Sequence, residues 1–424
     1  MRLKVSARVA AIRPYRPLGL RVFNGVGGAL RAAGVPLVRL DEHSLLARAV
    51  KNTGLSDFGD QDFREPLRVL LASFENEAAL TLLGRIIARG DTVRTLENRL
   101  HFVDTLKRHP EITAAPISRP LFILGLPRTG TTILHELLAQ DPANRVPMTW
   151  EVMHPWPPPE HATYETDPRI AQVEKHFSGV DKLVPGFKTM HPMGAQLPQE
   201  CVAITQHDFA TMIYPTTHYV PSYQQWLDAA NMRPVYRAHT RWLQYLQWRC
   251  PAQRWVLKSP GHLWALDALL AVYPDARIVQ THRDPLKVIA SLASLVAMLR
   301  GMASDHIDPQ AIGAEWTVRL AQGLEKTMQV RAGGGLRDEQ VFDMQFSEFI
   351  ADEIAMVRRI YRHFDMEFTE EAERRMRRFL AANPKDKHGA HRYTLGQSSL
   401  DQAAERRRYA AYQERYGIVS EPTA

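Results

Sequence analysis

Residues 120–132, PLFILGLPRTGTT, decide the fold of this 424-residue chain. The apolar run 121–125 predicts a buried strand, and the glycines and threonines after it predict a tight turn that leads into a helix. The spacing of Gly125 and Gly130 resembles a phosphate-binding loop of the form G-x-x-x-x-G-K-[ST]. Thr131 stands where that loop has its lysine, and Arg128 supplies a basic residue inside the loop instead. This loop suits a single 5′-phosphate better than a metal-bound triphosphate.

The same order of elements, strand and then helix, recurs beyond this loop. Apolar runs at 254–258 and 276–282 are each followed by turn residues and a helical pattern, and 340–346 reads as a fourth run. This alternation predicts an α/β fold with a P-loop-like parallel sheet flanked by helices. Ligands of such sheets bind beyond the carboxyl ends of the strands, so the chemistry is expected there.

The N-terminal quarter has a different pattern. Residues 41–110 carry apolar side chains at spacings of three and four, which predicts helices. We therefore expect a helical N-terminal region over 1–115 and an α/β domain over 116–424, with a helical insertion at about 160–250. The first 40 residues are basic and lack a signal-peptide pattern, and no run of about 18 apolar residues predicts a membrane span. The expected location is the cytoplasm. The basic N-terminus could contact a membrane surface peripherally, and a frayed or packed N-terminal arm is the favoured alternative.

Composition limits the partners. Hydrophobic residues make up 45% of the chain and charged residues 23%, as in soluble globular proteins. The net charge of +7 fits an anionic ligand or surface, although a mild basic excess spread over a large surface explains it equally well. Cys201 and Cys250 have no metal-like spacing, which argues against a zinc site and a disulfide framework. We expect no nucleic-acid partner and no metal, and a homodimer is the expected assembly.

A second anion site is predicted at 279–295, VQTHRDPLKVIASLASL. Asp284 fits a helix N-cap with Pro285 at the first helical position. Arg283 lies at the end of the strand, and Ser291 lies about two turns into the helix. Together they could bind a separate phosphate through charge-assisted hydrogen bonds. On their own, such residues are more often structural.

The two motifs together resemble those of a known enzyme family. LGLPRTGTT (124–132) and YPDARIVQTHRDPLKVIASL (273–292) look like the paired signatures of sulfotransferases that use 3′-phosphoadenosine 5′-phosphosulfate (PAPS). The chain is most similar to bacterial sulfotransferases with R-T-G-T-T in the loop, and more distantly to tyrosylprotein sulfotransferases. The resemblance covers roughly 116–400. It implies transfer of a sulfonyl group from PAPS to a hydroxyl of a small-molecule, lipid or carbohydrate acceptor, without a metal.

The resemblance also implies roles for individual residues. Arg283 and Ser291 would bind the 3′-phosphate, and Lys258, which follows the strand at 254–258, would contact the sulfonyl oxygens. A surface lysine at a strand end is the alternative for Lys258. The segment 385–400 resembles the part of these enzymes that closes over the nucleotide. The loop residues expected at the 5′-phosphosulfate are Arg128, Thr129, Gly130, Thr131 and Thr132, and those of the closing segment are Lys387, His388 and Gly389.

Sulfonyl transfer to a hydroxyl needs a base, which is a histidine or a glutamate in this family. Glu151 is favoured, because it follows Arg128 by 23 positions at what reads as the end of a second strand. His154 lies in a Pro- and Trp-rich loop in which Trp156 could line an apolar acceptor pocket. The remaining candidates, which could also contact the acceptor, are His191 and Glu200. Glu200 fits a helix-start carboxylate as well.

Two other functions stay open at this stage. A nucleotide-binding regulatory protein could keep the fold without turnover, and a degenerate P-loop kinase could keep the loop without its lysine. The aromatic residues between 150 and 245 could line an acceptor pocket or form the core of the helical insertion. They are Trp150, Trp156, Phe187, Tyr214, Tyr219, Tyr223, Trp226, Trp242 and Tyr245.

Overall fold

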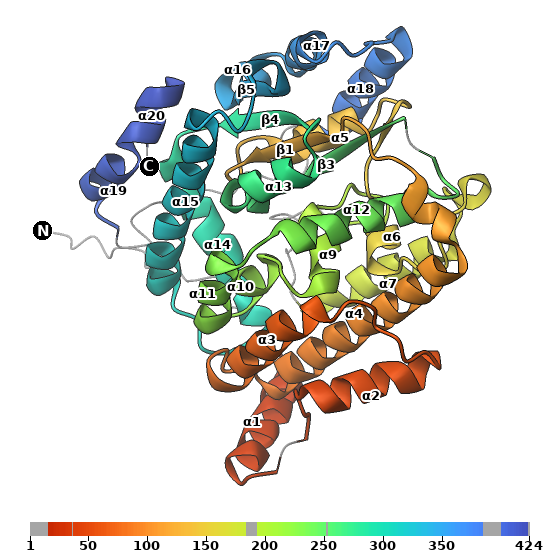
Figure 1. Ribbon diagram of the computed structural model, residues 1–424. Coiled ribbons are helices and arrows are strands. Elements are labelled where there is room, and N and C mark those ends of the chain that lie inside the picture. The colour runs from red at the N-terminus through yellow and green to blue at the C-terminus, as the bar shows by residue number, and fades with distance from the viewer. Residues whose placement is uncertain (1–15, 36, 184–192, 252, 385–399, 423–424) are drawn as a thin grey trace, which may run out of the picture.

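The computed structural model describes residues 16–35, 37–183, 193–251, 253–384 and 400–422, and a five-stranded parallel sheet lies at its centre (Figure 1). The strand order is β2-β3-β1-β4-β5, and every neighbouring pair is parallel. Four strands confirm the runs expected from the sequence, whereas the two-residue β2 is too short to show a periodic pattern. The strands are β1 (Leu121–Gly125), β2 (Asn144–Arg145), β3 (Arg254–Lys258), β4 (Arg277–His282) and β5 (Val341–Gln345).

Helices cover both faces of the sheet, because alternate side chains of each strand point to opposite sides. Leu121 and Ile123 of β1 pack into one core with four helices: α5 (Thr131–Leu138), α16 (Phe346–Ala351), α17 (Glu353–His363) and α18 (Glu370–Ala382). Phe122 and Leu124 face a second core on the other side. Its helices are α12 (Arg233–Gln247), α13 (Leu266–Val272), α14 (Pro285–Ala303) and α15 (Pro309–Ala332). The α/β fold class expected from the sequence is confirmed.

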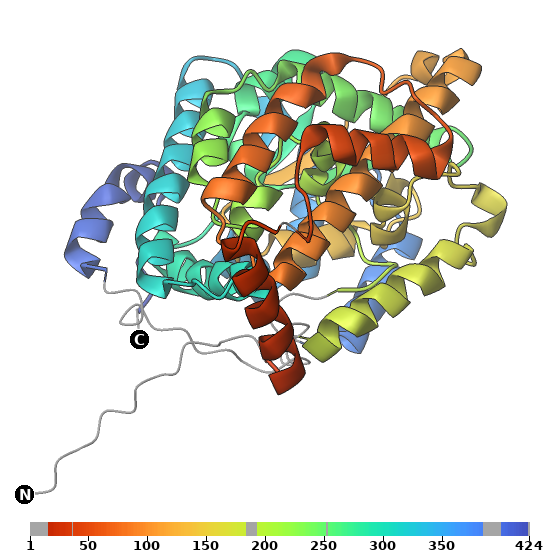
Figure 2. The same ribbon diagram turned by 90° about the horizontal axis from the view of Figure 1, so that it is seen from below.

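The N-terminal helices form a layer on the far side of this second core (Figures 1 and 2). They are α1 (Leu18–Ala32), α2 (Glu42–Thr53), α3 (Arg64–Asn76) and α4 (Leu82–Arg108), which confirms the helical pattern read at 41–110. A Cβ atom on Gly84 would lie 2.0 Å from the carbonyl oxygen of Ala303, at the end of α14. This close approach requires glycine and joins α4 directly to the α/β part of the chain.

Further helices lie between β2 and β3 and at the C-terminus. They are α6 (Thr149–Met153), α7 (Pro168–Leu183), α9 (Cys201–Thr205), α10 (Ile213–Thr217), α11 (Pro221–Ala229), α19 (Gln402–Arg408) and α20 (Ala410–Tyr416). Most of the aromatic residues singled out in the sequence are core residues here, since Trp150, Tyr223 and Tyr245 are fully buried. Trp156 and Tyr219 are exposed, and Phe187 lies outside the described residues.

One helix differs from the sequence expectation. Among the described residues, α14 is long and apolar enough to cross a membrane by length and composition. Of its apolar window, however, 72% is buried inside the protein, between the sheet and the N-terminal helices. Its apolar character is therefore that of a core helix.

Candidate active site

The loop after β1 depends on its two glycines. Gly125 has φ 152°, and a Cβ atom there would lie 2.1 Å from Thr281 Oγ1 of the neighbouring strand β4. Gly130 has φ 89° and immediately precedes α5. Both backbone conformations are ones that residues with side chains rarely adopt. The sequence spacing therefore encodes a loop that lies tightly against β4 and ends at the N-terminus of a helix.

Arg128 and Arg283 meet at this loop, although 155 positions separate them. The guanidinium of Arg283 donates from Nη1 to the carbonyl oxygen of Arg128 over 3.0 Å. Arg128 is exposed and has φ 65°, while Thr132 at the start of α5 is also exposed and Thr131 is buried. Two arginines and a helix N-terminus at one sheet edge are suited to bind an anion with more than one phosphate or sulfate group.

Thr129 has a different place from its neighbours. Its hydroxyl group is fully buried, donates to the carbonyl oxygen of Leu126 over 2.6 Å and lies 2.5 Å from Thr281 Oγ1. The hydroxyl thus attaches the loop to β4. The sequence had suggested Thr129 as a hydrogen-bond donor to the ligand, and we do not assign it that role.

The carboxylate of Glu421 is hydrogen-bonded to the guanidinium of Arg283. Arg283 donates from Nε to Oε1 over 2.8 Å and from Nη2 to Oε2 over 2.9 Å. Asp284 caps α14 as expected, by accepting from Leu286 N, and it also accepts from the backbone N–H of Glu421 over 2.7 Å. Ser291 is buried two turns along α14. The C-terminal segment therefore puts an anionic group where the sequence predicts a 3′-phosphate.

Lys258 ends β3 and pairs with Glu200. The surface-lysine alternative is wrong, because the side chain is buried and its Nζ lies 2.5 Å from Glu200 Oε1. Glu200 directly precedes α9, but its side chain makes no capping hydrogen bond to that helix. The next residue, Ser259, accepts from Gly261 N and so begins the short helix Pro260–Trp264. Lys258 and Glu200 form an ion pair at the carboxyl end of the central strands.

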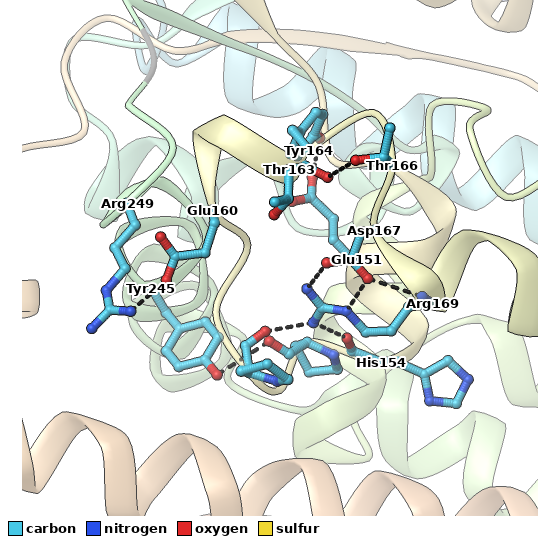
Figure 3. A network of polar contacts seen from close by, with 12 residues as sticks. Glu151, His154, Glu160, Thr163, Tyr164, Thr166, Asp167, Arg169, Tyr245 and Arg249 are labelled. Carbon is cyan, nitrogen blue, oxygen red and sulfur yellow. Dashed lines mark hydrogen bonds and ion pairs between the residues drawn. The ribbon is translucent and has the colours of Figure 1, made fainter.

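Glu151 lies in helix α6 rather than at a strand end, since β2 already ends at Arg145. Its carboxylate is fully buried and accepts from three donors: Arg145 Nη2 at 2.8 Å, Met148 N at 2.9 Å and the hydroxyl of Tyr164 at 3.0 Å. Figure 3 shows Glu151 and Tyr164. A buried carboxylate that accepts three hydrogen bonds holds the donating segments of the chain together. The geometry gives Glu151 a structural role and does not support the sequence hypothesis that it is the base.

The other acceptor-side candidates are spread apart. Arg169 donates to the carbonyl oxygens of His154 and Pro157, and Figure 3 shows this network beside Asp167. Burial, with the charges of nearby arginines, lowers the pKa of His154 to about 4, so its ring is neutral at pH 7. Trp156 is 45% exposed and stacks on His101 of α4. His191, Lys387, His388 and Gly389 lie outside the described residues.

A cavity of about 380 Å³ opens beside Ser259. Its walls come from α9, from the segment that joins α11 to α12, from Pro260–Trp264 and from the facing sides of α13 and α15. Within the described part of the chain no group of three or more His, Cys, Asp or Glu side chains could hold a metal ion. Cys201 and Cys250 are both buried as free thiols.

The parallel sheet and the loop after β1 show the general class of the protein. It is a P-loop-like α/β protein with a loop suited to bind an anion after its first strand. A sequence profile described as the sulfotransferase family matches residues 120–370, more than half of the chain. The chain belongs to the sulfotransferase family and is a sulfotransferase enzyme, as the two motifs had indicated.

Solved structures agree with this assignment. Sulfotransferase STF1 from Mycobacterium tuberculosis H37Rv is 35% identical, with a TM-score of 0.78 over 88% of this chain and 98% of that one. STF9 from Mycobacterium avium is 32% identical, with a TM-score of 0.83 over 90% and 98%. A curated relative from Mycobacterium bovis, omega-hydroxy-beta-dihydromenaquinone-9 sulfotransferase Stf3, is 25% identical over 299 residues, which are 66% of this chain and 71% of the relative.

Proposed function

We propose that the enzyme transfers the sulfonyl group of PAPS to a hydroxyl of a small-molecule, lipid or carbohydrate acceptor. The observation that carries this is the contact of Arg283 with the loop at the carboxyl edge of the sheet, where its Nη1 donates to the backbone carbonyl oxygen of Arg128 over 3.0 Å. PAPS carries a phosphosulfate at its 5′ end and a phosphate at its 3′ end. The loop with Arg128, Thr131 and Thr132 binds the first, and Arg283 with Ser291 binds the second.

The Lys258–Glu200 pair supplies the chemistry of the transfer. The acceptor oxygen attacks sulfur, the bond from sulfur to the 5′-phosphate oxygen breaks, and adenosine 3′,5′-bisphosphate leaves with that electron pair. As PAPS binds, the ammonium group of Lys258 moves toward the sulfonyl oxygens and stabilises their negative charge. This movement releases the carboxylate of Glu200, which is partly exposed, to take the acceptor's proton. We therefore assign the base to Glu200, with the buried Glu151 as its matched control.

Differential binding tests the donor. Adenosine 3′,5′-bisphosphate should raise the melting temperature, and ATP with Mg²⁺ at the same concentration should not. At about 100 times Kd the ligand adds roughly 2.7 kcal/mol to the free energy of unfolding. A preference for ATP with Mg²⁺ would contradict the PAPS assignment and favour a kinase.

The composition and the exposed face of the N-terminal segment support contact with a membrane surface. The first 40 residues contain eight Lys or Arg and no Asp or Glu. Helix α1 packs its Asn24 and Gly27 edge on α4 and exposes Leu18, Val22 and Val26, which follow each other at four-residue spacing. An apolar stripe in a basic segment fits an anionic membrane surface. The protein should co-sediment with vesicles that contain phosphatidylglycerol but not with pure phosphatidylcholine, and Val22→Asp should abolish the binding. Equal recovery with both vesicles would contradict membrane contact.

A further inference from the structure

The cavity of about 380 Å³ begins beside the proposed reaction centre. Ser259 and Cys201, which line it, directly follow Lys258 and Glu200 in the chain. Apolar side chains such as Met212, Met232 and Leu266 form much of its wall. A cavity of this size that adjoins a proton acceptor can hold the body of a small amphipathic molecule.

Arg319 of α15 lines this cavity and is buried with unused hydrogen-bond donors. It is 6% exposed, and its Nε and Nη1 atoms have no hydrogen-bond partner among the residues that the structure describes. The guanidinium carbon lies 4.4 Å from the ring centre of Trp316 and 5.9 Å from that of Trp264. Glu315 Oε1 is 3.8 Å from Nη1, beyond hydrogen-bond distance. Burial lowers the pKa of Arg319 to about 10, so the side chain stays charged at pH 7.

Arg300, on the neighbouring helix α14, is a buried arginine whose donors are hydrogen-bonded within the protein. It is equally buried, but it donates to both oxygens of Glu315, at 2.8 and 2.7 Å, and to the carbonyl oxygen of Pro215. Glu315 is therefore committed to Arg300. A buried donor without a hydrogen-bond acceptor is costly, and none of the described residues provides one to Nε and Nη1 of Arg319, whose charge is balanced by the more distant Asp228 and Glu315 carboxylates.

The other charged groups on the cavity wall are less buried. Lys326 is half-buried and donates to the backbone carbonyl of Asp228. The carboxylate of Asp228 also lies on this wall, half-buried, and accepts from Gln224 Nε2 over 2.6 Å, while Asp267 is exposed at the start of α13. Among the charged residues described on this wall, Arg319 is the buried one. An anionic group that enters the cavity thus meets its unsatisfied donor at Arg319.

We propose that this cavity is the acceptor subsite and binds a hydroxy acid, with its carboxylate on Arg319 and its apolar chain along the wall. Its hydroxyl group then lies toward Lys258 and Glu200. This inference rests on the proposed sulfonyl transfer and adds the chemical class of the acceptor: an apolar molecule with a hydroxyl at one end and a carboxylate at the other.

Three matched probes test the subsite: ω-hydroxydecanoate, its methyl ester and decanol. Binding is measured by calorimetry on the native protein, with and without adenosine 3′,5′-bisphosphate. We expect the acid to bind roughly ten times more tightly than the ester and decanol, as one charge-assisted contact provides. Equal binding of the three, preference for the ester, or no binding of any probe would overturn the subsite. Failure of the bisphosphate to bind would instead contradict the proposed function, and the probe series would still decide the subsite.

Substitution then locates the contact. Arg319→Gln should remove the preference for the acid and raise its KM, with affinity for the bisphosphate unchanged. Arg319→Lys should keep part of the preference, because it keeps the charge but loses the planar pair of donors. Retention of the full preference in Arg319→Gln would show that the carboxylate binds elsewhere. If the glutamine variant does not fold, the probe series on the native protein and the lysine variant still decide.

Discussion

Replacement of Glu421 by glutamine should tighten the binding of the nucleotide. In the structure, both carboxylate oxygens of Glu421 accept from the Arg283 guanidinium, at 2.8 and 2.9 Å, so a 3′-phosphate has to displace them. The two side chains are 23% and 33% exposed, and partly exposed ion pairs contribute about 0.2–1 kcal/mol. Because glutamine keeps the size but not the charge, Kd for adenosine 3′,5′-bisphosphate should fall roughly 1.5- to 5-fold.

Calorimetry with two nucleotides separates this effect from a general change in the site. AMP lacks the 3′-phosphate, so its affinity should be the same in both proteins. Arg283→Ala is the opposite control and should weaken the bisphosphate by about 1.5–3 kcal/mol while it barely changes AMP. An unchanged or weaker affinity of Glu421→Gln for the bisphosphate, or an equal gain for AMP, would refute the assignment of Arg283 to the 3′-phosphate.

Three further predictions concern the base, the loop and pH. Glu200→Gln should lower kcat by about 10²–10⁴ with nucleotide affinity intact. Glu151→Gln should instead lower the melting temperature, because it leaves the buried Arg145 without its counter-charge, at a cost of about 3–5 kcal/mol; the opposite result would assign the base to Glu151. Gly125→Ala should abolish bisphosphate binding, since its Cβ would collide with β4, and normal binding in calorimetry would contradict the loop geometry. Burial lowers the pKa of His239 and His262 to about 3, so the unfolded chain binds more protons than the folded one below pH 6.5. The melting temperature should therefore fall as pH decreases from 6.5 towards 3, and a flat profile would contradict the neutral state of these rings.

The sequence was sufficient for features that depend on local order. The apolar run before Gly125, the spacing to Gly130 and the cap at Asp284 are each contained in a few residues, and the structure has them as expected. The sequence placed Arg128 and Arg283 after two strands of one parallel sheet but at separate sites, so the hydrogen bond between them is a finding of the structure.

Contacts between residues that lie far apart in the sequence could not be predicted from local sequence order. Glu421 lies 138 positions from Arg283, and no pattern around either residue indicates the pair. The same holds for Lys258 and Glu200. The distance of Glu151 from Arg128 along the chain likewise says nothing of its burial, which depends on Arg145 and Tyr164.

The tie between the C-terminal segment and strand β4 has a practical consequence. His282 of β4 contacts Tyr412 and Asp343, and the next residue, Arg283, donates to the carboxylate of Glu421. A purification tag fused after Ala424 would begin four positions after Glu421, the carboxylate that competes with the nucleotide. Such a fusion would alter the measured affinity by pulling Glu421 away or by adding its own charges. Proteins prepared for the binding assays should carry the tag elsewhere, or lose it by cleavage before the titration.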